Sequence, residues 1–315
     1  MNNIMVDNWF MEEVIADINN NTECNSKNYA DLLMAIVLWD EVYYPQNTRN
    51  WWKSFPSQVQ NALQPIEDIE EQGYQSNLHD LRPMSAIPLL SYLAQNPKIR
   101  SDIISTAALH YAKLSSKNGC DYLPCKERQS LLQKFMTPPN IQKSLTRMKM
   151  QGNLDKAIEE YYADTYKALL DFSDLKLKMP ALVNFILDNT PKEMTPVDYA
   201  FHLKNEGAVI KYRQYLSQVE EALENQNWKD LRFLLRCSDD AVSEVTALDK
   251  KNLGRVKVRL LPTPSILLEY GGLSADISST SSFEIKTNIK NPFRKIHLTF
   301  LKDLTRYAIN DMKLW

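Results

Sequence analysis

The chain contains little glycine, with seven glycines in 315 residues, where an average protein has about 7%. Glycine is the residue that most readily adopts positive φ or lets the backbone approach a phosphate. The seven glycines form no G-x-G-x-x-G, no Walker loop and no G-x-S-x-G. These absences exclude the common nucleotide-binding loops and the serine nucleophile motif of α/β-hydrolases.

A long hydrophobic run is also absent. The longest, residues 32–39, contains eight residues, whereas a membrane helix needs about 20. The first 17 residues carry four acidic side chains and no basic stretch, which is unlike a secretory signal. We therefore expect a cytoplasmic protein that does not use a membrane.

Cysteine is sparse and scattered, which favours reduced thiols over a disulfide framework. Cys120 and Cys125 have no second pair at the spacing of a zinc site, and no H-E-x-x-H motif is present. We therefore expect no metal and no cofactor. Either thiol could act as a nucleophile with His110, but a small apolar thiol near a helix end is more often packed.

Apolar residues recur at intervals of three and four through most of residues 7–252, which predicts amphipathic helices. The clearest helix start is Thr195-Pro196-Val197-Asp198, where a Thr N-cap precedes Pro and a carboxylate. Further helices are expected over 209–223, 228–248 and 296–312. The pattern changes near residue 254, where Val256, Val258 and Leu260 alternate with basic residues, and this alternation predicts strands.

The expected fold class is mainly α: a multi-helix bundle body with a small C-terminal antiparallel β-sheet and a closing helix. Residues 1–150 would form an N-terminal helical lobe and residues 151–252 a second helical lobe. Residues 253–315 would hold a basic β-hairpin or sheet followed by the C-terminal helix.

Charge is divided unevenly although the net charge is only −2. Residues 250–315 hold 12 Lys and Arg against 5 Asp and Glu, which leaves 25 against 34 in the rest. A cationic row on one face of the predicted strands could bind nucleic acid or an acidic partner, or could protect a sheet edge from another chain. The candidate binding residues are Arg255, Lys257, Arg259, Lys286, Lys290, Arg294 and Lys295.

Two carboxylates, Asp40 and Glu41, follow the longest apolar run. With Asp102, Asp121 or Asp164 they could hold the divalent ion of a nuclease, although a solvated helix end explains them equally well. The nearby aromatic residues are more simply explained as core. They are Trp39, Tyr43, Tyr44, Trp51, Trp52 and Phe55.

Three stretches carry a resemblance: LLMAIVLWDEVYYP at 32–45, HYAKLSSKNGCDYLPCKERQSLL at 110–132 and KYRQYLSQVEEALENQNWKDLRFLLR at 211–236. Together they resemble poorly characterised, largely helical bacterial proteins of the kind found among phage-defence genes. The resemblance implies a bacterial source and a helical protein, and it supplies no catalytic motif.

The resulting functional hypothesis is a non-catalytic accessory or recognition protein that binds another protein, as a subunit of a bacterial anti-phage defence complex. Two alternatives stay open. One is a carboxylate- and metal-dependent nuclease or toxin, and the other is a nucleic-acid-binding protein acting through the basic C-terminal region.

Overall fold

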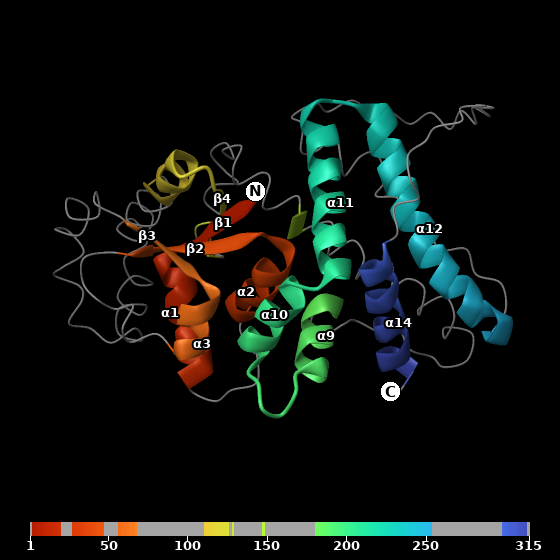
Figure 1. Ribbon diagram of the computed structural model, residues 1–315, viewed down its shortest axis with the longest axis horizontal. Coiled ribbons are helices and arrows are strands. Elements are labelled where there is room, and N and C mark those ends of the chain that lie inside the picture. The colour runs from red at the N-terminus through yellow and green to blue at the C-terminus, as the bar shows by residue number, and fades with distance from the viewer. Residues whose placement is uncertain are drawn as a thin grey trace, which may run out of the picture. The chain divides into compact units, whose positions relative to one another are not determined.

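The structure is a computed structural model (Figure 1). Its described residues fall into two compact units. The first unit comprises residues up to Met148 together with Ile186–Asn205, and the second comprises Lys149–Phe185 and Glu206–Trp315. The residues that the structure describes are 2–19, 27–46, 56–67, 110–125, 128, 147–148, 180–253 and 298–313.

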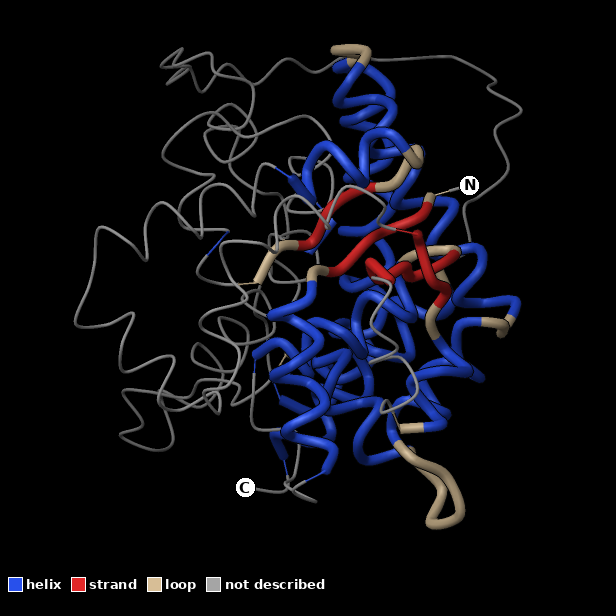
Figure 2. Tube along the Cα trace, turned by 90° about the vertical axis from the view of Figure 1, so that its left-hand side faces the viewer, coloured by secondary structure: helices blue, strands red, loops and turns tan. Residues whose placement is uncertain are grey.

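The first unit is built on a four-stranded sheet, drawn in red in Figure 2. Every strand pair in this sheet is parallel. Its strands are β1 (Asn3–Val6), β2 (Glu41–Gln46), β3 (Gln64–Glu67) and β4 (Asp121–Leu123), in the order β3-β2-β1-β4. Ile4 of β1 lies opposite Val42 on one side and Asp121 on the other. From β1, the next two strands in the chain, β2 and β3, are added on one side and β4 on the other, so the order in which strands are added changes side between β1 and β4.

Helices connect these strands, as parallel pairing requires. They are α1 (Asn8–Asn19), α2 (Lys27–Leu38) and α3 (Ser57–Ala62), and all three lie on one side of the strands in Figure 1. Residues 110–117 form a helix that precedes β4 and lies on the other side. Helices thus cover both faces of the sheet, which explains why β1 is apolar at every position after Asn3 rather than alternating.

The centre of this unit is α2, in which every residue from Asn28 to Leu38 is buried. One covering element is α10 (Pro196–Lys204), which packs against α2 and α3. It begins with the expected cap, because the Thr195 side chain accepts a hydrogen bond from the Asp198 amide and Asp198 accepts one in return from Thr195.

The second unit, over its described residues, consists of helices. In it α11 (Gly207–Glu224) packs against α12 (Trp228–Leu253), and both pack against α14 (Thr299–Lys313). Its core includes an aromatic group in which the Phe185 ring meets Phe300 and Tyr307 edge-on, at 6.1 and 5.3 Å between ring centroids. Phe185 belongs to α9 (Ala181–Asn189), and the boundary between the units falls within that helix.

The prediction of a mainly α fold is wrong, and so is its all-alpha reading of the N-terminal lobe, because residues 3–6, 41–46, 64–67 and 121–123 form a parallel sheet. These strands are only three to six residues long, so their apolar residues merge with the helical pattern on either side. The described residues after Leu123 contain helices and no strand. The C-terminal strands expected after residue 254 lie outside the described residues.

Several helices are confirmed, namely the one expected to start at Thr195-Pro196 and those expected over 209–223, 228–248 and 296–312. The domain divisions near residues 150 and 252 stay predictions. Within the described part of the chain, no helix is long and apolar enough to cross a membrane.

Candidate functional site

The candidate site lies at the carboxyl ends of β1 and β4, where the strand order reverses. Open parallel sheets bind ligands in this position because the helices that follow adjacent strands diverge there. Asp7 is the first residue after β1, and Cys125 is the second residue after β4. Both are fully buried.

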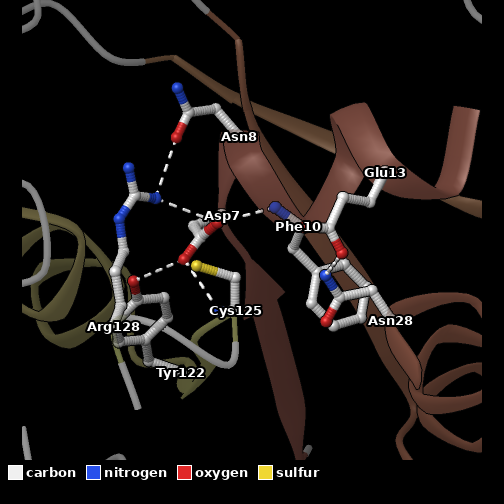
Figure 3. A network of polar contacts seen from close by, with 8 residues as sticks. All are labelled: Asp7, Asn8, Phe10, Glu13, Asn28, Tyr122, Cys125 and Arg128. Carbon is white, nitrogen blue, oxygen red and sulfur yellow. Dashed lines mark hydrogen bonds and ion pairs between the residues drawn. The ribbon is translucent and has the colours of Figure 1, made fainter. Parts of the chain in front are cut away.

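Asp7 accepts hydrogen bonds from four donors (Figure 3). Its Oδ1 atom lies 2.9 Å from the backbone amide of Phe10 and 2.9 Å from Nη1 of Arg128. Its Oδ2 atom lies 2.9 Å from the Tyr122 hydroxyl and 3.0 Å from the Cys125 amide. One carboxylate therefore holds together the ends of β1 and β4 and the first turn of α1.

Arg128 is the cationic partner of Asp7 and is itself only 2% exposed. Its Nη1 atom also donates to Oδ1 of Asn8 at 2.9 Å. Its guanidinium carbon lies 4.9 Å from the centre of the Trp9 ring and 5.1 Å from that of Tyr111. These aromatic contacts compensate in part for the loss of water around the cation.

Burial and neighbouring charges keep Tyr122 and Arg128 protonated. Burial raises the pKa of Tyr122 well above its usual value, and the adjacent charge of Asp7 raises it further. Burial alone would lower the pKa of Arg128, but Asp7 and the neighbouring phenols and thiol raise it above its usual value. At neutral pH the cluster thus contains a protonated phenol and a guanidinium around Asp7.

The chemistry open to Asp7 is therefore limited. A general base needs an oxygen that can accept a proton from a substrate, and a carboxylate that serves a metal must turn a lone pair toward the ion. Each Asp7 oxygen already accepts two hydrogen bonds. The arrangement suits Asp7 to positioning the sheet edge, with no reaction of its own.

A second polar group lies beside this cluster, across the Phe10 ring in Figure 3. Asn28 at the start of α2 is buried and donates to Glu13 of α1. One turn later, Asp31 pairs with Lys27. Burial raises the pKa of Asp31 even though Lys27 opposes that shift.

The carboxylates proposed from the sequence lie at the opposite, amino edge of the sheet. Asp40 accepts a hydrogen bond from the Asn2 amide at 2.8 Å, and Glu41 pairs with Lys204 at 3.4 Å. Asp121 begins β4 and accepts from the indole nitrogen of Trp39 at 3.0 Å. The fold therefore brings Asp40, Glu41 and Asp121 to one edge, but each has a donor. Within the described ranges, no group of three His, Cys, Asp or Glu residues could hold a metal.

Some of the remaining sequence candidates are buried, and others lie outside the described residues. Cys120 and Cys125 are buried, and burial raises the pKa of the Cys120 thiol to about 11, which makes it a poor nucleophile at neutral pH. Trp39 and Tyr44 are core residues as expected. Asp102, Asp164, Trp51, Trp52, Phe55 and all seven basic candidates (Arg255, Lys257, Arg259, Lys286, Lys290, Arg294 and Lys295) lie outside the described residues.

Sequence reasoning missed Asp7 and Arg128. A signal for Asp7 was present, because Ile4-Met5-Val6 is an apolar run followed by Asp7-Asn8, which is typical of a buried strand that ends at a polar edge. No comparable signal exists for Arg128, which is separated from Asp7 by more than a hundred residues.

Comparison of the chain with protein-family models, with curated proteins and with solved structures found no match.

Proposed function

We propose that this protein is a non-catalytic recognition protein that binds another protein. The observation that carries the proposal is the exposure of two large aromatic side chains on α12, Trp228 at 46% and Phe233 at 45%. Tryptophan and other large aromatic residues dominate the binding energy of protein interfaces. A folded protein that keeps two of them in water on one helix has a surface suited to a partner.

The carboxyl edge of the sheet adds support of a different kind. Its central carboxylate, Asp7, is engaged by four donors and takes a positioning role. The residues that best suit recognition, by contrast, are exposed. We place the protein in the cytoplasm, and the resemblance described above extends the proposal to a subunit of a bacterial anti-phage defence complex.

Native mass measurement of the tagged full chain, captured from cells that produce it, tests this function. We expect a complex of fixed stoichiometry that is lost when Trp228→Ala and Phe233→Ala are combined. Phe201→Ala is the matched control, because Phe201 is an exposed aromatic residue of α10 in the other unit. Recovery of the chain alone, or a complex unaffected by the α12 substitutions, would contradict the proposal.

A further inference from the structure

The exposed face of α12 has an unusual composition over its first two and a half turns. Leu231, Leu234 and Leu235 are buried against the rest of the unit. The exposed positions of the same turns carry two aromatic and three basic side chains together with Asp230. We call the aromatic and basic residues the α12 face: Trp228, Lys229, Arg232, Phe233 and Arg236.

Helical spacing makes the α12 face continuous. Trp228, Arg232 and Arg236 follow one another at intervals of four, and Lys229 and Phe233 form a second row with the same interval. The face spans about 12 Å along the helix axis, at 1.5 Å per residue. This length matches two turns of a partner helix or three to four residues of an extended segment.

The cations of the α12 face have no ion-pair partner in the part of the chain that the structure describes. Among the described residues, no carboxylate lies within ion-pair distance of Lys229, Arg232 or Arg236. Asp230, next to Lys229 in the chain, instead accepts a hydrogen bond from the Asn227 side chain, and Asp240, four residues after Arg236, is exposed. Lys229 also lies in the first turn of α12, near the positive end of the helix dipole, where cations are unfavourable and anions are favoured.

The inference drawn from the α12 face rests on the proposed function and specifies the partner. We propose that the α12 face binds an acidic segment of the partner protein that also carries large apolar side chains. The guanidinium groups of Arg232 and Arg236 offer paired donors that match carboxylates, and Trp228 and Phe233 offer apolar area beside them. The binding segment is thus defined by Asp and Glu residues alternating with Leu or Phe.

A nucleic acid would use similar chemistry, but the surroundings of the face favour a protein. Glu221 and Glu224 are exposed in the last turn of α11, immediately before the loop that leads into α12. Their charges repel a phosphate backbone that extends beyond the α12 face. A short acidic segment can end within the face, so it avoids this repulsion.

Fluorescence anisotropy with the full chain tests the assignment. The probe is a labelled eight-residue peptide of alternating acidic and Leu or Phe residues, compared with the same peptide with Lys in place of each acidic residue and with labelled oligo-dT of eight nucleotides. We expect the acidic peptide to bind, and the combined Arg232→Glu and Arg236→Glu variant to weaken its binding at least tenfold. The combined Trp228→Ala and Phe233→Ala variant should weaken it similarly.

Arg306→Glu is the matched control, since Arg306 is a half-exposed arginine of α14 in the same unit, and it should leave binding within twofold. Far-UV circular dichroism checks that each variant is folded. Absence of acidic-peptide binding, tighter binding of oligo-dT, or loss of binding in Arg306→Glu alone would overturn the assignment. If the complex captured from cells persists and the combined Arg232→Glu and Arg236→Glu variant does not change peptide binding, the assignment of the α12 face fails and the proposed function survives. If no complex is captured at all, the proposed function fails.

Discussion

Replacing Asp7 with Asn should severely destabilise the first unit. The amide keeps the shape of the carboxylate, but each carboxylate oxygen of Asp7 accepts from two donors. In either orientation of the amide, its NH2 group, which is itself a donor, would therefore face two other donors. It also leaves Arg128 as a buried cation without its carboxylate. We expect the free energy of unfolding to fall by about 3–5 kcal/mol, the usual cost of removing one partner of a buried pair.

The structure supplies a matched comparison for the magnitude. Arg128 and Asp7 are 2.9 Å apart and almost fully buried, while Arg306 and Asp303 are 2.9 Å apart and about half exposed. Coulomb's law at this separation gives about 1.4 kcal/mol in water and about 6 kcal/mol at an effective dielectric of about 20. Solvent screening reduces the exposed pair to about 0–1 kcal/mol, so Asp303→Asn should have little effect.

Urea unfolding followed by circular dichroism measures both changes. Hydrogen exchange at the amides of Phe10 and Cys125 adds a local measurement, because both donate to Asp7 and should exchange faster in the variant. If Asp7→Asn fails to fold, Arg128→Met serves instead, because three donors to Asp7 remain and the loss should be smaller. A cost for Asp7→Asn no larger than that of Asp303→Asn would refute the reasoning.

Three further predictions concern single side chains. Tyr122 has a raised pKa in the folded state, so its contribution to stability is complete below about pH 10 and is lost as the pH rises further. Tyr122→Phe should therefore lessen the fall in the free energy of unfolding with pH by up to about 1.4 kcal/mol per pH unit. Equal slopes of unfolding free energy against pH for the two proteins, measured by urea unfolding between pH 10 and 11, would contradict this. The pKa of Asp31 is raised in the folded state, so the contribution of Asp31 to the free energy of unfolding declines as the pH rises from about 4, the usual pKa of an aspartate. Asp31→Asn should therefore raise the urea midpoint more at pH 7 than at pH 4, and the reverse order would show that the Lys27 pair outweighs burial. Gln226, between α11 and α12, has a φ of 52°, a left-handed conformation that glycine adopts more easily than glutamine. Gln226→Gly should therefore stabilise the second unit by about 0.5–1 kcal/mol. A lower melting temperature of the variant in calorimetry would show that the left-handed conformation is not strained.

Local sequence was sufficient to predict the helices of the second unit and the start of α10. In α11 and α12 the apolar residues recur at helical spacing, and Thr195-Pro196 with Asp198 carries a complete capping signal within four residues. Gly119, two residues after the helix of residues 110–117, has a φ of 64°, a conformation that glycine adopts readily. Such features depend on interactions between residues close in the chain, so the sequence alone contains the information.

The parallel sheet and the Asp7 cluster were decided by tertiary structure. β1 pairs with residues 41–43 on one side and with residues 121–123 on the other, and no local pattern records which distant segments will meet. A short strand buried on both faces is uniformly apolar, so its composition resembles that of a buried helix segment. The apolar run before Asp7 was a local signal for the end of a strand, but it did not indicate the partners of Asp7. Only the fold surrounds Asp7 with Tyr122, Cys125 and Arg128, because burial and charge pairing depend on contacts between segments more than a hundred residues apart.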